Sequence, residues 1–167
     1  MLITAGNLDI YSVTHATSAT TMWGPAQLVK PFNTAVTEKW FAPCSGSYYV
    51  IVRSTATNET DLFEGMLGGG APTPIDTLNT ASTETGAFLT QDCLTLYFAS
   101  TRVTPEKIFM SRRATVTSPW PAPAQVDDFK IAGGNGAQED PWLSLDRRTF
   151  AFASNAAGTK DIYLSTR

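Results

Sequence analysis

The C-terminal stretch PWLSLDRRTFAFASNAAGTKDIYLSTR, residues 141–167, decides the fold of this chain. It divides into three short extended pieces, residues 141–144, 149–154 and 161–165, which are joined by two polar turns. The middle piece alternates large and small residues, and its aromatic content suits a pleated, half-buried surface better than a helix. The stretch therefore predicts a meander of three antiparallel strands.

The same unit recurs upstream, as in a repeat protein. A shift of 54 residues aligns residues 88–92, 96–100 and 107–111 with the three pieces without a gap. A second shift, of 47 residues, aligns 41–46 and 49–52 with the first two strands, and 61–64 follow as the third. Residues 2–5 and 8–13 resemble only the second and third strands. A proline-containing run follows each third strand, at 23–29, 72–78 and 120–126. Because proline cannot donate to an interior ladder, these runs are predicted to be fourth, edge strands.

Four short antiparallel strands per unit are typical of β-propeller blades. We expect an all-β protein with a single propeller domain or propeller segment over residues 1–167, with units at about 1–29, 38–78, 85–126 and 139–167. That is about three complete blades plus incomplete terminal ones. Because unpaired strand edges invite association, we expect either a homo-oligomer whose chains complete one ring or a segment of a larger ring.

The composition excludes several classes of partner. The 167 residues suit one domain, and 12 Lys and Arg against 15 Asp and Glu give a net charge of −3. This balance argues against a nucleic-acid partner, which requires a basic face. No apolar run approaches the ~20 residues of a membrane span, and the first residues lack the pattern of a signal peptide. Since the chain opens directly on strand-like residues, we expect that an upstream piece was removed or that this is a segment of something longer.

Cysteine and histidine are too few for a common zinc site. The chain has two cysteines, Cys44 and Cys93, outside any CxxC pair, and one histidine, His15. No cofactor or metal is expected. A disulfide between the two cysteines stays open as an alternative, but the favoured interpretation is two small, partly buried thiols near turns.

The C-terminal unit resembles a known family. Residues 139–146 (EDPWLSLD), 150–154 (FAFAS) and 161–163 (DIY) are similar to the TolB-type, WD-like (PD-type) propeller repeat, whose pattern runs acidic, Pro, aromatic, Ser, Pro, Asp, Gly, an apolar strand ending in Ser-x-Arg, then Asp-Ile-Tyr. Ser100-Thr101-Arg102 shows the same Ser-x-Arg ending. Leu145 and Arg147 depart from the pattern, replacing Pro and Gly. The resemblance implies a propeller that binds proteins or cell-envelope components, in a periplasmic or secreted setting, with no catalytic motif in the repeat itself.

The residues give little support to catalysis. A serine hydrolase needs a base and an orienting acid, but His15 lies in a polar stretch and no GxSxG elbow is present. Residues 144–150 approach the Asp-box of sialidase-like propellers without its Gly, and we interpret them as a structural turn.

Charged residues near the predicted inner strands are the candidate site. Glu38, Glu84, Glu139 and Asp140 precede first strands, so a propeller brings them towards one mouth of its channel, and Arg53 and Arg102 end second strands. The favoured interpretation is that the acids cap strands or pair with the arginines. We therefore predict a non-enzymatic binding or scaffold module that engages a protein or glycan partner at the channel mouth. The alternative is a carbohydrate-active hydrolase, or a fragment of one, using two of these acids.

The tryptophans form two predicted groups. Trp23 and Trp120 lie on edge strands beside proline and are expected to cover gaps between blades, with sugar stacking or partner packing as the alternative. Trp40 and Trp142 are expected to be inner-strand core.

Overall fold

The computed structural model describes residues 2–5, 9–14, 23–30, 32–55, 59–127 and 135–166. They form four small antiparallel sheets. The N-terminal sheet contains β1 (Leu2–Ala5), β2 (Asp9–Ser12) and β3 (Gln27–Leu28). The second sheet contains β4 (Glu38–Pro43), β5 (Tyr48–Ser54), β6 (Thr60–Met66) and β7 (Thr73–Pro74). The third sheet contains β8 (Glu84–Leu89), β9 (Thr95–Ser100), β10 (Lys107–Arg112) and β11 (Ala124–Gln125). The C-terminal sheet contains β12 (Gln138–Leu143), β13 (Thr149–Ser154) and β14 (Asp161–Thr166).

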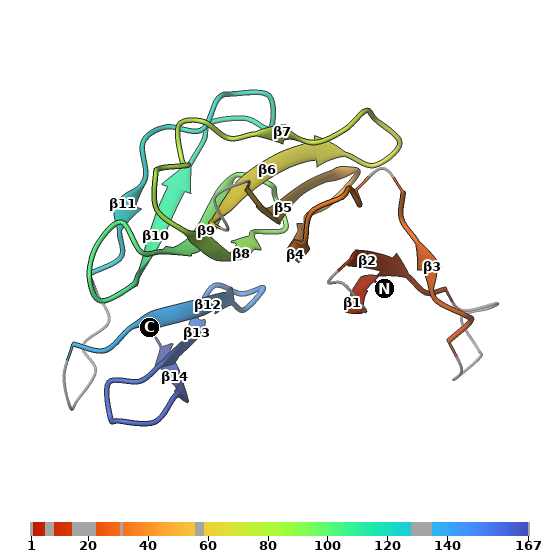
Figure 1. Ribbon diagram of the computed structural model, residues 1–167. Coiled ribbons are helices and arrows are strands. Elements are labelled where there is room, and N and C mark those ends of the chain that lie inside the picture. Colours follow the sequence, from red (N-terminus) through yellow and green to blue (C-terminus); the bar gives the residue numbers. More distant parts are fainter. Residues whose placement is uncertain are drawn as a thin grey trace.

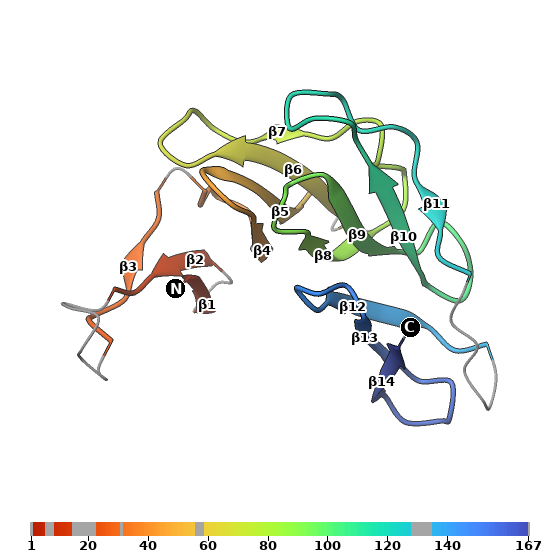
Figure 2. The same ribbon diagram turned by 180° about the vertical axis from the view of Figure 1, so that it is seen from behind.

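The four sheets follow one another along an open arc, with the N-terminal and C-terminal sheets at its two ends (Figures 1 and 2). Strands β4, β8 and β12 lie on the concave side, and the short strands β7 and β11 lie on the convex side. The described residues contain no helix. This is the arrangement of β-propeller blades, and the all-β propeller prediction is confirmed.

Two sheets, not three, are complete four-stranded blades. The N-terminal sheet has the second, third and fourth strands of the repeat, and the C-terminal sheet has the first three, as the sequence indicated.

The alignment of the first strand by a shift of 47 residues is wrong by one position. Ala42, not Phe41, corresponds to Phe88, since Ala42 pairs with Val50 as Phe88 pairs with Tyr97. The hairpin after β4 is one residue shorter than the hairpin after β8, so no single shift can align both of its strands.

Each inner strand carries the same β-bulge at its third residue. The pairing register shifts between Lys39 and Ala42, and at the matching places in β8 and β12. The residues inside the bulges, Trp40, Gly86 and Asp140, have φ values of 42°, 54° and 50°. A left-handed residue in each inner strand breaks the regular alternation of side chains along the strand.

This bulge overturns two predictions about tryptophan. Trp40 is 37% exposed and Trp142 is 48% exposed, so neither is core. A strict period of two, which the sequence argument assumed, does not continue through a bulge.

The core lies between neighbouring sheets. Ile10 of the N-terminal sheet packs with Tyr49 and Ile51 of the second sheet. Val52 and Leu62 of the second sheet pack with Phe98 of the third. Ile108 of the third packs with Phe150 and Phe152 of the C-terminal sheet. Apolar burial between successive sheets therefore fixes the arc.

Candidate functional site

The start of β4 holds a buried ion pair. Glu38 is the first residue of the strand and is 0% exposed. Its Oε1 accepts from Arg53 Nε at 3.0 Å, and from the Thr34 amide and hydroxyl at 3.1 and 2.6 Å. Arg53 also donates to the Phe32 carbonyl at 2.7 Å and lies over the Phe63 ring. Oε1 is thus occupied by structural partners, which offset part of the cost of burying the carboxylate, whereas the buried Oε2 has no hydrogen-bond partner among the described residues.

The same cluster recurs at the start of β8, but its arginine comes from a different position of the repeat. Glu84 is 0% exposed, and its Oε1 accepts from Thr80, Ser100 and Arg102 at 2.8, 2.9 and 3.0 Å. Arg102 donates to the Leu78 carbonyl and lies over the Phe109 ring. Arg53 is the penultimate residue of β5, whereas Arg102 lies two residues beyond the end of β9, so the two guanidiniums reach equivalent carboxylates from different positions of the repeat.

A short sequence signal precedes both clusters and was missed by the strand alignment. Residues 32–38 read FNTAVTE and residues 78–84 read LNTASTE. Asn33 bonds the amide and carbonyl of Ile10 at 2.7 and 2.8 Å, and Asn79 does the same to Leu62 at 2.8 and 2.9 Å. Each asparagine therefore ties the segment before an inner strand to the third strand of the preceding sheet. A search for repeated polar residues, as well as apolar ones, would have found this pattern.

Glu139 and Asp140 lie inside β12, not before it. Glu139 accepts from Lys160 Nζ at 2.7 Å, and this hydrogen bond raises the pKa of Lys160. Asp140 Oδ1 accepts from Trp40 Nε1 at 3.1 Å, a bond that joins the bulges of β12 and β4. Gly86 lies against Asp140, and a Cβ at Gly86 would meet the Asp140 amide nitrogen at 2.9 Å. The three bulges therefore converge.

The opposite ends of the inner strands carry matching hairpin turns. In the third sheet, Thr90 Oγ1 donates to Asp92 Oδ1, and the Leu94 amide donates to the same oxygen. In the C-terminal sheet, Ser144 Oγ and the Arg148 amide donate to Asp146 Oδ1. The Ser144–Asp146 segment is therefore a self-contained turn, as predicted. The hydrogen bonds from Ser144 and the Arg148 amide lower the pKa of Asp146.

A disulfide joins the first two hairpins. Cys44 and Cys93 are bonded, with Cα atoms 5.3 Å apart and a sequence separation of 49. The favoured prediction of two thiols is wrong, and the open alternative is correct. The sequence could not show this bond, because only the packing of the second and third sheets brings these two turns together.

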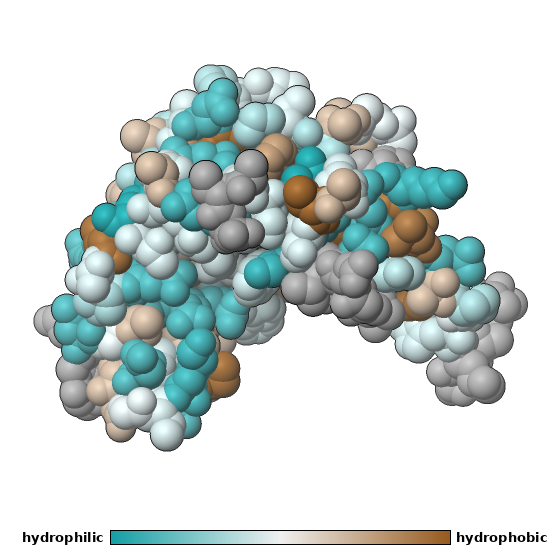
Figure 3. Space-filling model, viewed as in Figure 1, coloured by the Kyte–Doolittle hydropathy of each residue, from teal (hydrophilic) through white to brown (hydrophobic). Residues whose placement is uncertain are grey.

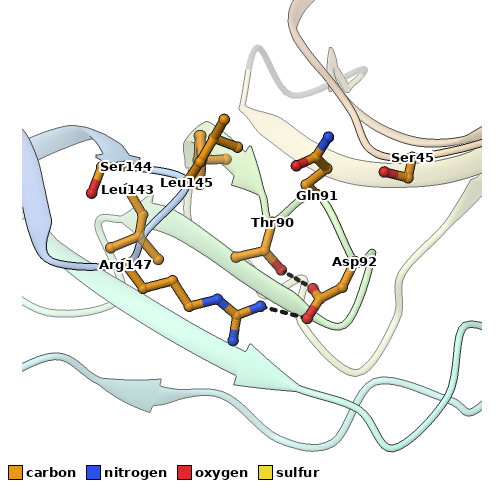
Figure 4. Close-up of a pocket in the computed structure, with 9 residues that line it drawn as sticks. Ser45, Thr90, Gln91, Asp92, Leu143, Ser144, Leu145 and Arg147 are labelled. Carbon is orange, nitrogen blue, oxygen red and sulfur yellow. Dashed lines mark hydrogen bonds and ion pairs between the residues drawn. The ribbon is translucent and has the colours of Figure 1, made fainter.

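An ion pair joins the next two hairpins. Arg147 donates to Asp92 Oδ2, and both side chains are partly exposed. Burial raises the pKa of Asp92, but the hydrogen bonds from Thr90 and Arg147 and the charge of Arg147 outweigh it, so the pKa lies below its ordinary value. Figure 4 shows the Arg147 guanidinium and the Thr90 hydroxyl both directed at the Asp92 carboxylate.

Between these hairpins lies a hollow with a partly apolar wall, which we call the hairpin hollow. It consists of two adjoining cavities of about 330 and 360 Å³ that share the lining residues Ser45, Phe88, Gln91, Leu143 and Leu145. Trp142 and Pro43 line one cavity, and Asp92 and Arg147 line the other. Leu145 is 82% exposed at the rim. An exposed leucine and a half-exposed tryptophan beside a concave surface are features of a binding site.

None of the six predicted site residues lines the hairpin hollow. The structure brings together Glu38 with Arg53, and Glu84 with Arg102, as the capping and pairing interpretation held. A binding role for Glu38, Glu84, Glu139, Asp140, Arg53 and Arg102 stays a prediction. His15 lies outside the described residues.

The two edge tryptophans differ. Trp120 is 3% exposed, and its Nε1 donates to Glu64 of the second sheet at 2.7 Å. It therefore covers the joint between the second and third sheets, as predicted. Its ring also lies over the guanidinium of Arg113, which in turn lies over Tyr48. Trp23 is 47% exposed.

The residues that the structure describes include neither a candidate metal cluster nor a candidate membrane-spanning helix. Within the described ranges, no group of three or more His, Cys, Asp or Glu residues is placed to hold a metal ion. No helix among those residues has the length and apolar character needed to cross a membrane.

The fold and site define a segment of a β-propeller with a hollow at one end of its inner strands. No family model matches the sequence, and no curated protein matches it. Among solved structures, the chain is similar to one described as "putative TolB from Agrobacterium tumefaciens", with a TM-score of 0.66 at 16% sequence identity. The match covers 97% of this chain and 52% of that one, so the chain spans about half the length of the protein it resembles. This likeness supports the propeller fold.

Proposed function

We propose that the chain is a non-enzymatic binding or scaffold module that engages a partner in the hairpin hollow, which lies at the end of the inner strands opposite to the channel mouth predicted from Glu38 and Glu84. The observation that carries the proposal is the exposure of Leu145 and Trp142 beside a concave wall that includes Phe88 and Leu143. Apolar side chains left exposed around a hollow gain free energy when a partner covers them.

A protein is the partner class that the lining favours. Two polar groups of the lining are already engaged, since the Asp92 carboxylate accepts from Thr90, Arg147 and the Leu94 amide. The Ser144 hydroxyl is likewise occupied by Asp146. The exposed apolar rim matches the aliphatic or aromatic anchor that dominates protein interfaces. The experiment below also tests for a glycan partner.

The hydrolase alternative lacks support in this geometry. A glycosidase needs two carboxyl groups that face the substrate, one to donate a proton and one to attack or to activate water. Glu38 and Glu84 are fully buried in ion pairs, and Glu139 is paired with Lys160.

The disulfide supports a location outside the reducing cytosol. Structural disulfides persist in oxidising compartments and are rare where thiol reductants are abundant. The periplasmic or secreted setting implied by the repeat resemblance is consistent with the Cys44–Cys93 bond.

The test is a binding screen with matched variants. Wild-type chain is used to select binders from a displayed peptide library and from an immobilised glycan panel, and the affinities of the hits are measured by calorimetry. Leu145→Asp and Trp142→Ala should each weaken peptide binding at least tenfold. Val116→Asp, at a 40% exposed apolar residue that does not line the hollow, is the control and should bind like wild type.

Two results would contradict the proposal. One is peptide or glycan binding that is unchanged in both hollow variants. The other is glycoside turnover that disappears in Glu84→Gln or Glu139→Gln while circular dichroism shows intact folding, since this would make the chain an enzyme.

A further inference from the structure

Every joint between neighbouring sheets in the arc uses the same two faces. We call the face that meets the following sheet the forward face, and the face that meets the preceding sheet the rear face. The forward faces present Ile10, Leu62 and Ile108, one from each of the first three sheets, and all three are 0% exposed. Each lies at the same place in its third strand, opposite Thr4, Val52 and Ala99 respectively.

The C-terminal sheet has an uncovered forward face. Ile162 pairs with Ala153 and so holds the position of Ile108, yet Ile162 is 71% exposed. Leu164, two residues along on the same face, is 68% exposed. The rear face of the same sheet is covered, because Phe150 and Phe152 pack on Ile108. Figure 3 shows hydrophobic atoms on the lobe formed by this sheet, within a mostly hydrophilic surface.

The rear face of the N-terminal sheet has the matching pattern. Tyr11 pairs with Ile3, and thereby holds the register position of Phe63, Phe109 and Tyr163, which pair with Ile51, Phe98 and Phe152. In the other three sheets, rear-face residues at these positions pack on the sheet before. The N-terminal sheet lies at the opposite end of the arc from β14 (Figures 1 and 2).

We propose that the Ile162–Leu164 forward face docks on the Tyr11 rear face of a second copy of this chain, so that two chains close one ring head to tail. The contact continues the forward-to-rear packing that the chain already makes at three joints. Two copies supply eight sheets, within the 4 to 8 blades typical of propellers.

The first test measures mass. Light scattering of the full chain should give twice the 18.0 kDa of one chain. Ile162→Asp should return the mass to that of one chain, with an unchanged circular dichroism spectrum because Ile162 is mostly exposed in a single chain. Ile162→Thr, which keeps a β-branched residue in the strand, should raise the dissociation constant at least tenfold. The control is Leu145→Asp, which replaces another exposed apolar residue, in a hairpin turn away from the proposed contact. This variant should keep the double mass.

The second test establishes direction. In head-to-tail closure, Tyr11→Asp should also give single chains, and mixing it with Ile162→Asp should restore particles of double mass, because one joint of the two stays intact. If Tyr11→Asp keeps the double mass while Ile162→Asp loses it, the C-terminal sheets pair with each other and the proposal is overturned. It is equally overturned if the wild-type chain stays at 18.0 kDa at all concentrations, or if Ile162→Asp keeps the wild-type mass.

Discussion

Cys93 and Arg147 hold the same place in consecutive hairpins, and each is bonded to the hairpin before its own. Their φ values, 62° and 59°, are both left-handed. Cys93 reaches back to Cys44 through a disulfide, and Arg147 reaches back to Asp92 through an ion pair. One backbone position thus links successive blades by two different chemistries, and both links border the hairpin hollow.

The disulfide is expected to be the stronger link. Replacing Cys44 and Cys93 by Ser should lower the free energy of unfolding by about 2 to 5 kcal/mol, since the bond closes a loop across 49 residues of sequence separation. Urea unfolding followed by fluorescence measures the change. A reductant should destabilise the wild type and leave the double variant unaffected; equal stability of the wild type with and without reductant would show that the bond contributes nothing.

The ion pair is expected to be weak, because both side chains are partly exposed. Arg147→Ala should destabilise the chain by less than about 1 kcal/mol. Arg147→Gly should be more stable than Arg147→Ala by about 1 kcal/mol, since glycine tolerates the left-handed φ that alanine does not. If the alanine variant is the more stable of the two in urea titrations, backbone strain is not the governing factor at this position.

The Asp92–Arg147 pair also predicts an acid dependence. Because the folded-state pKa of Asp92 lies below its ordinary value of 3.8, the pair stabilises the fold at pH values above 3.8. That contribution is lost as the pH falls through the lowered pKa. In Asp92→Asn this part of the acid destabilisation should disappear, which urea titrations of both proteins at a series of acidic pH values would detect. Identical pH profiles would contradict the role of the pair.

Substitution of Glu84 should lower the free energy of unfolding far more than substitution of Asp92. Glu84→Gln keeps the shape but removes the charge that offsets the guanidinium of Arg102, so we expect a loss of about 3 to 5 kcal/mol. Glu139→Gln, whose pair with Lys160 is more exposed, is the control and should lose less than about 1 kcal/mol. A similar loss in both variants would mean that burial does not set the strength of these pairs.

Glu106 should make stability fall as the pH rises. Burial raises its pKa above the ordinary 4.5, against the opposing hydrogen bond from Thr85, and the nearby charge of Glu139 raises it further. The folded state therefore holds the proton longer than the unfolded state, and stability declines between pH 4.5 and the raised pKa. Glu106→Gln, which mimics the protonated form, should gain stability relative to wild type over that range. A constant difference between the two across the range would contradict this.

The apolar alternation and turn residues of 141–167, with their recurrence upstream, were sufficient to predict strands, blades and incomplete ends, because these depend on local periodicity and hairpin chemistry. Strand β13 was predicted at its observed bounds, Thr149–Ser154. The bulges at Trp40, Gly86 and Asp140 could not be predicted, since their left-handed positions are occupied by three different residue types and so share no sequence signal. This is why Trp40 and Trp142 were assigned to the core.

Which residues meet across blades depends on how the sheets pack, and the repeat pattern does not show it. Arg53 and Arg102 reach equivalent carboxylates from non-equivalent positions, so no fixed shift of the sequence could show that their guanidiniums correspond. Cys44 and Cys93 come together because two sheets pack face to face. The repeating unit follows from the amino-acid sequence alone, since each blade is specified by its own strands and turns. The hollow, the disulfide and the exposed face at Ile162 depend on how successive blades pack, which is settled by contacts between residues distant in the chain.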